Sequence, residues 1–263
     1  EFVEIALQEG VCPERGYQLV LENYGTCNSI TMFESLGHQL PLADRQALAE
    51  LLLRHVHAEL LSSLKGDISQ QQEVEPEGDS LEQLVEGREW LFGEHSYHID
   101  TTHLASTVRF ARCLADKDVL RLALDLTHYG RQLSEQFQYA GDEPFADIYL
   151  NHALFFQALL GENVEEALSH FQERAENVSR DEFGTAAVEV LVDLLARVGR
   201  YGEAIEVSSR LLPPGTQTMG HAPSLVELSE LADDYEALVS LSREQKDLLG
   251  FTVGLVRAGV KRA

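Results

Sequence analysis

Hydrophobic residues recur along most of this chain at three- and four-residue steps, the spacing of a helix with one buried face. The clearest case lies between Leu42 and Leu64, where the apolar positions are Leu48, Leu51, Leu52, Val56, Leu60, Leu61 and Leu64. Asp44 is the expected N-cap of this helix, and Gly66 is expected to follow its end. Alternating β-branched runs and Asn-Gly or Asp-Gly turns are missing from the sequence, so it predicts an all-α protein.

A polar segment interrupts the pattern and predicts a boundary between two parts of the chain. Residues 69–79 are acidic and broken by proline and glycine, a composition typical of a linker. Ser80 then begins a new helix, and Gln83 is placed to complete a capping box. We expect an N-terminal helical segment over 1–68, the linker over 69–79, and a helical repeat domain over 80–263.

Helical segments alternate with short breaks beyond the linker, and such short connections force neighbouring helices to lie antiparallel. The pattern also predicts helices over 14–23 and 30–36 in the N-terminal part. After the linker, it predicts helices over 80–93, 101–115, 118–138, 144–160, 164–177, 181–198, 201–212, 223–232, 235–248 and 250–260.

The strongest local pattern is an apolar helix that ends at a glycine and is followed by an aromatic residue and a small residue. Leu191, Gly199, Tyr201 and Ala204 form it, and Tyr235 follows Tyr201 after 34 residues. A similar unit precedes this one, with Gly161, Ala167 and Phe171. Repetition at this period is typical of a helical solenoid.

At these residues, and over roughly 144–248, the chain resembles the tetratricopeptide repeat family. It departs from the family pattern at Val188, Val192 and Ser208, where the motif has its early tryptophan, a small residue and its late aromatic residue. The resemblance implies an α-solenoid, a right-handed superhelix of antiparallel helical hairpins, which follows the separate N-terminal helical segment. An irregular helical bundle is the alternative architecture.

The family resemblance also implies a function, because such repeats bind peptides or partner proteins in a concave groove. The first helix of each pair lines that groove, and the polar residues expected on it are Asn151, Glu189, Asp193 and Arg197. We therefore expect a non-enzymatic interaction scaffold that needs no cofactor.

The charge of the chain restricts its partners. Forty-four acidic residues against 20 lysines and arginines give a net charge of −24, which repels nucleic acid and anionic lipid alike. No apolar run approaches the ~18 residues of a membrane span. The partner that this charge favours is a basic peptide. The alternative is that the acidic residues only keep the surface soluble.

One cluster has the composition of a metal site and supports an alternative function. His95, His98, Asp100 and His103 supply three imidazoles and a carboxylate within a short segment, which suits a divalent metal in a helical enzyme. Helix capping by Asp100 or Thr101 is the simpler interpretation. Nucleophile-elbow, zinc-protease, phosphate-loop and dinucleotide motifs are missing from the sequence, so the primary expectation is not an enzyme.

Two further features concern location and assembly. Three scattered cysteines do not suit a disulfide framework, which favours a reducing, cytoplasmic location. Phe251, Val253, Leu255 and Val256 leave the last helix apolar, whereas a terminal repeat needs a polar cap. Pairing of this helix with a second copy, as a homodimer, is therefore a third hypothesis.

Overall fold

The computed structural model of the protein describes residues 42–72, 78–86, 104, 107–108, 111–137, 144–177, 185–212, 216 and 222–262. Every regular element among these residues is a helix, so the predicted all-α class is confirmed for the part of the chain that the structure describes. Contacts along the chain divide it into two compact units, Glu1–Leu160 and Gly161–Ala263. The sequence pattern had placed the boundary at 69–79.

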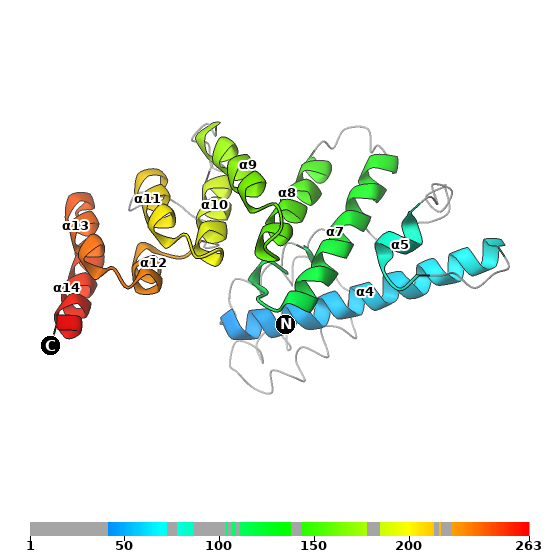
Figure 1. Ribbon diagram of the computed structural model, residues 1–263, viewed down its shortest axis with the longest axis horizontal. Helices are drawn as coiled ribbons and strands as arrows, with labels where there is room; N and C mark the ends of the chain where they lie inside the picture. The colour runs from blue at the N-terminus through cyan, green and yellow to red at the C-terminus, as the bar shows by residue number, and fades with distance from the viewer. Residues whose placement is uncertain are drawn as a thin grey trace, which may run out of the picture. The chain divides into compact units, whose positions relative to one another are not determined.

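In the first unit the longest helix, α4 (Leu42–Gln72), packs against three other elements. These are α5 (Leu81–Val85), the 3-10 helix η2 (Ala111–Cys113) and α7 (Lys117–Phe137). The next helix, α8 (Pro144–Leu159), packs along α7, as Figure 1 shows. The large side chains of α4 that are fully buried are Leu48, Leu52, Leu53, Leu60 and Ile68. Leu48, Leu52 and Leu60 were predicted to lie on this face, whereas Leu51, also predicted there, is 41% exposed.

The helix α4 neither starts after Asp44 nor ends at Gly66, so both expected boundaries are corrected. Leu64 and Ile68 lie one turn apart on either side of this glycine and are both buried, so the packed face continues past it. The gain from burying Ile68 exceeds the roughly 1 kcal/mol that a glycine costs inside a helix. As a result, α4 includes residues 69–72 of the expected linker. The capping box at Ser80 is confirmed, because the hydroxyl of Ser80 accepts a hydrogen bond from the backbone amide of Gln83 at 3.2 Å.

Six helices form the described part of the second unit. They are α9 (Val164–Asn177), α10 (Ala186–Arg197), α11 (Tyr201–Leu211), α12 (Leu225–Ala232), α13 (Tyr235–Gln245) and α14 (Leu248–Arg262). Each helix packs against the next in chain order, and α14 also contacts α12 (Figure 1). This order of contacts is compatible with a helical repeat.

The turn between α10 and α11 has the form that the sequence predicted. Gly199 adopts a positive φ of 81°, a conformation that glycine reaches without steric cost. The amide of Arg200 donates to the carbonyl of Leu195 at 2.8 Å and so closes the end of α10. Tyr201 then begins α11, and Ala204 is fully buried, which lets the two helices approach closely.

The boundary between α13 and α14 differs from the prediction of helices over 235–248 and 250–260. Lys246 adopts a left-handed conformation with φ 60°, which ends α13 at Gln245. The carboxylate of Asp247 then accepts hydrogen bonds from the amides of Leu249 and Gly250, both at 3.1 Å, and so caps α14. Asp247 is a favourable N-cap residue that the hydrophobic pattern alone did not reveal.

Candidate functional site

Three of the four residues predicted to line a groove lie on one face of α10. Glu189, Asp193 and Arg197 follow one another at four-residue steps, which places them on the same side of the helix. Glu189 is fully buried and Asp193 is 5% exposed. Arg197 is half-buried, and its Nε donates to Oδ1 of Asp193 at 2.8 Å. This polar face of α10 (Glu189, Asp193 and Arg197) is therefore largely enclosed by protein.

The fourth predicted residue, Asn151, lies on α8 in the first unit. Its side chain is half-buried. The four residues are therefore divided between the two units, and the polar face of α10 consists of three of them.

The enclosure of this face follows from the sequence of α10. Its remaining residues are mostly large and apolar, and the buried ones are Val188, Leu191, Val192, Leu194 and Leu195. The helix packs against α9 on one side and α11 on the other. Because α10 is an interior helix, its polar residues are also drawn out of water, and this desolvation costs free energy that their interactions must offset.

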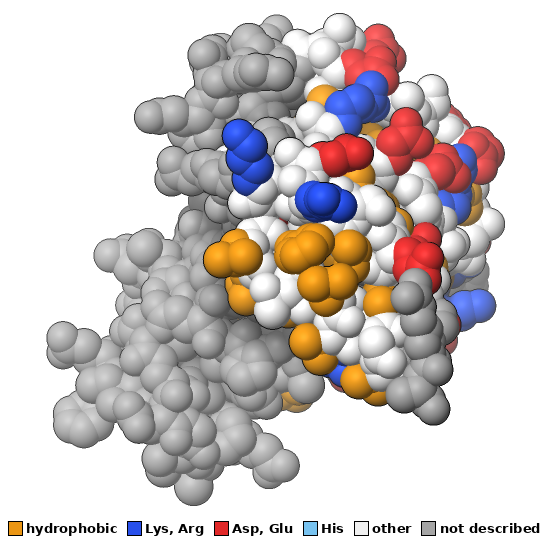
Figure 2. All heavy atoms as spheres, turned by 90° about the vertical axis from the view of Figure 1, so that its left-hand side faces the viewer, with side chains coloured by type: hydrophobic (Ala, Val, Ile, Leu, Met, Phe, Trp, Pro, Cys, Tyr) orange, Lys and Arg blue, Asp and Glu red, His pale blue; other side chains and the backbone are white. Residues whose placement is uncertain are grey.

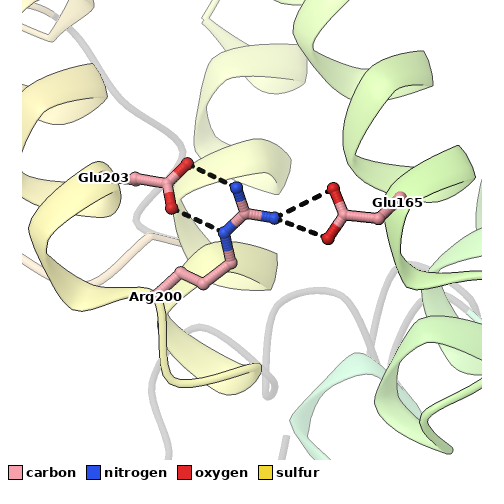
Figure 3. Close-up of polar contacts among 3 residues, drawn as sticks. All are labelled: Glu165, Arg200 and Glu203. Carbon is pink, nitrogen blue, oxygen red and sulfur yellow. Dashed lines mark hydrogen bonds and ion pairs between the residues drawn. The ribbon is translucent and has the colours of Figure 1, made fainter.

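A cluster of three ionic side chains lies beside α10 and was not predicted. Arg200 donates from Nε and Nη2 to the two carboxylate oxygens of Glu203, both at 2.6 Å. Its Nη1 donates to Glu165 at 2.9 and 3.2 Å, so the guanidinium lies between two carboxylates, as Figure 3 shows. Glu165 is in the first turn of α9 and Glu203 in the first turn of α11, so Arg200 connects the two helices.

The electrostatic effect of this cluster is mutual. The hydrogen bonds from Arg200 lower the pKa of the Glu203 carboxyl below its usual value, and those same bonds raise the pKa of Arg200 above its own. All three side chains reach solvent, so water screens the interaction. The geometry indicates a positioning contact between helices and does not suggest a reaction centre.

The second surface of interest is the side of α14 that faces solvent. It carries Leu248, Leu249, Leu255, Val256 and Val260, which are exposed by 78, 74, 50, 60 and 69%. Thr252 and Gly259 are exposed between them. We call these seven residues the outer face of α14. Figure 2 looks onto this end of the chain and shows a group of hydrophobic side chains near the middle of the view, with smaller hydrophobic groups around it.

The predicted metal cluster of His95, His98, Asp100 and His103 lies outside the described residues. Among the residues that are described, no group of three or more histidine, cysteine or acidic side chains is arranged to hold a metal ion. In the same part of the chain, no helix combines the length and the apolar character needed to cross a membrane.

The described helices define an all-α protein, and in its second unit successive helices pack in chain order. Comparisons with known proteins do not assign it to a family, since no family model, curated protein or solved structure matches the chain.

Proposed function

We propose that this chain is a non-enzymatic, cytoplasmic scaffold for protein–protein interaction, with a peptide-binding groove that includes the polar face of α10. In this proposal the hairpins of the second unit form a right-handed superhelix like that of tetratricopeptide repeats. The contact of each helix with the next and the tight turn at Gly199 support it, because such pairs are the building units of helical repeats. In a repeat of this kind α10 is the first helix of its pair and lines the groove.

The observation that carries the proposal is the presence of carboxylates on an interior helix. Apolar residues at positions 189 and 193 would stabilise α10 at least as well, because a buried charge seldom repays its desolvation. Stability alone therefore does not account for Glu189 and Asp193. We infer instead that they recognise a polar or charged ligand that displaces the side chains now enclosing this face, and the net charge of −24 favours a basic peptide.

The ion pair on α10 sets a condition on that ligand. Arg197 already offsets the charge of Asp193 at 2.8 Å. A basic side chain of the peptide must therefore compete with Arg197 for the carboxylate, while an acidic or amide side chain is free to contact Arg197 itself. The proposal commits to the first case, in which the peptide supplies a lysine or arginine and Arg197 turns toward solvent.

Fluorescence anisotropy with short labelled peptides tests this function. A basic, a neutral and an acidic peptide with the same apolar residues are titrated with the full chain, with Glu189→Gln and with Asp193→Asn. These substitutions remove charge but keep shape, which suits buried positions. We expect the basic peptide to bind most tightly and each substitution to weaken it about ten-fold, the loss of one charge-assisted contact.

The matched control is Glu206→Gln, which removes the same charge from an exposed position on α11. This substitution makes the net charge less negative by the same one unit, but the residue lies off the polar face of α10. Binding of the basic peptide should therefore change little. Equal weakening by all three substitutions would mean that only overall charge matters. Unchanged binding in Glu189→Gln and Asp193→Asn would remove α10 from the proposed groove.

A further inference from the structure

The helix α14 packs with Gly250 and Gly254 inward and leaves five large apolar residues exposed, the reverse of an ordinary amphipathic helix. A Cβ atom placed on Gly254 would lie 2.8 Å from Cγ2 of Val239 and 3.2 Å from its backbone nitrogen. At Gly250, one turn earlier, a Cβ atom would meet the side chains of Ser242 and Asp247. The two glycines thus bring the backbones of α13 and α14 together, and the outer face of α14 retains the leucines and valines.

The outer face has the spacing of a surface that packs against another helix. Leu248 and Leu249 recur seven residues later as Leu255 and Val256, with Thr252 midway between them. Leu248, Thr252, Leu255 and Gly259 follow one another at alternating four- and three-residue steps, the spacing of the seam along which two helices pack side by side, and Leu249 and Val256 flank it. A helix therefore suits this face as an occupant, and an extended strand does not.

The same spacing makes the outer face complementary to an inverted copy of itself. When two copies of α14 lie antiparallel with Thr252 opposite Thr252, Leu248 of each copy comes opposite Val256 of the other. Leu249 likewise comes opposite Leu255. A two-fold contact requires such a self-complementary pattern, because the same surface of each copy must fit that surface of the other copy. Here each apolar side chain meets another apolar side chain.

Charge also favours a second copy on this face. Across residues 248–260 the one charged residue is Arg257, which pairs with Glu230 of α12 at 3.0 Å. The outer face is therefore an uncharged area on a chain of net charge −24. A second acidic chain that docks there meets no acidic side chain of the outer face, so charge repulsion at the contact is small. A strongly charged partner would have no counter-charge to contact on the outer face.

The area of the outer face is close to what a dimer needs. The five exposed large side chains would bury about 500 Å² on each copy, or about 1,000 Å² in total, which is near the lower limit for a specific interface. Because the interface is small and wholly apolar, we expect weak association, with a dissociation constant in the micromolar range.

We propose that a second copy of this chain docks antiparallel on the outer face of α14, with the two-fold axis beside Thr252. This contact is independent of the peptide site proposed above, because it uses a different helix. Dimerisation covers the leucines and valines that would otherwise remain in water.

Sedimentation velocity on the full chain measures the association. We expect a monomer–dimer equilibrium between about 1 and 200 μM. Because both copies are acidic and the contact is apolar, raising the salt concentration should increase the dimer fraction. Leu255→Lys should weaken the dimer about ten-fold or more, because it places a charge in the apolar contact. The matched control, Leu51→Lys, changes an exposed leucine of α4 and should leave the equilibrium as it is.

A cysteine at the two-fold axis tests the register and needs no charge in the interface. Two antiparallel helices in contact bring the Cα atoms of facing residues to about 6 Å, within reach of a disulfide. Thr252→Cys should therefore form a covalent dimer on oxidation well above the level of the wild-type chain, whose own cysteines provide the baseline. Ser240→Cys, at an exposed position on α13, should remain at that baseline.

Several results would overturn the proposal. A wild-type chain that stays monomeric at about 200 μM in high salt has no such interface. A dimer that survives Leu255→Lys uses another surface. Equal cross-linking of Thr252→Cys and Ser240→Cys reflects random collision. A monomer that binds neutral lipid vesicles, and loses that binding in Leu255→Lys, would assign the outer face to a membrane surface instead. Circular dichroism tests whether each variant is folded. If Leu255→Lys is unfolded, the comparison of Thr252→Cys with Ser240→Cys decides whether the proposed interface exists.

Discussion

Replacing Gly130 with alanine should destabilise the first unit, although alanine is the better helix former. Gly130 lies inside α7, at the point where the backbone of α7 meets the ring of Tyr149 on α8. A Cβ atom at Gly130 would overlap Cε1 of that ring and lie 2.8 Å from its Cδ1. Tyr149 is fully buried, so its ring has no solvent space into which it can turn.

The size of the effect follows from two opposing terms. Alanine in place of glycine inside a helix stabilises it by up to about 1 kcal/mol. Forcing an extra carbon into a packed contact costs about 1–3 kcal/mol, because the ring and the helix backbones must shift. The clash prevails when the ring cannot move, so we expect Gly130→Ala to lower the free energy of unfolding by about 1 kcal/mol. For a unit of this size that corresponds to about 2–4 °C in Tm.

Gly66→Ala is the matched control, since it makes the same substitution inside a helix of the same unit. No heavy atom lies within 4 Å of a Cβ placed on Gly66, so only the helix propensity acts there. It should raise the free energy of unfolding by about 0.5–1 kcal/mol. Urea unfolding followed by circular dichroism measures both variants, and the signs should be opposite.

A double-mutant cycle then isolates the contact. In a Tyr149→Ala background the ring is gone, so Gly130→Ala should become neutral or stabilising. If Gly130→Ala stabilises the wild-type chain as much as Gly66→Ala does, then α7 and α8 do not approach each other closely at this glycine. If the penalty persists without the ring, the cost arises from the backbone and not from Tyr149.

Three smaller perturbations address other contacts. The hydroxyl of Ser242 is buried without a hydrogen bond, so Ser242→Ala should raise the free energy of unfolding by about 1 kcal/mol in a urea titration. Ser224 and Glu227 form a capping box on α12, so Ser224→Ala should cost about 1 kcal/mol in the same assay, and no loss would contradict the box. Burial, with a smaller effect of Asp67, raises the pKa of Tyr129 above its usual value of 10.0. The unfolded chain therefore releases this proton first, and stability should fall as the pH rises above about 10 by up to about 1.4 kcal/mol per pH unit. Tyr129→Phe should reduce that slope in unfolding titrations between about pH 9 and 11.

The features that were predictable from the sequence are those fixed within one or two helical turns. The helix over 164–177 begins and ends where the spacing of apolar residues placed it, and the turn at Gly199 follows from glycine and the residues beside it. The capping box at Ser80 depends on two residues three positions apart. Each is a local interaction, so the chain order alone specifies it.

The ionic cluster at Arg200 was not predictable in this way. The pairing of Arg200 with Glu203 is a local helical spacing, but Glu165 lies 35 positions away and meets Arg200 only after α9 and α10 have packed. The acidic residues at the start of α9 fit a favourable interaction with the helix dipole equally well. Their separation of 35 residues is close to the repeat period, and this is the one sequence signal that connects Glu165 with Arg200.

The side of α14 that packs inward depends on its glycines more than on its hydrophobic residues. Apolar side chains occur all round this helix, so their pattern does not say which side is buried. Gly250 and Gly254 decide it, because helices that meet through glycine approach closely enough for the two backbones to pack directly. Helical geometry then places Leu248, Thr252 and Leu255 on the opposite side. The unit thus gains close packing of α13 and α14 and leaves more apolar surface in water than an amphipathic helix would. A second helix laid along that surface recovers the burial, and the packing of these two glycines is what makes such a surface available.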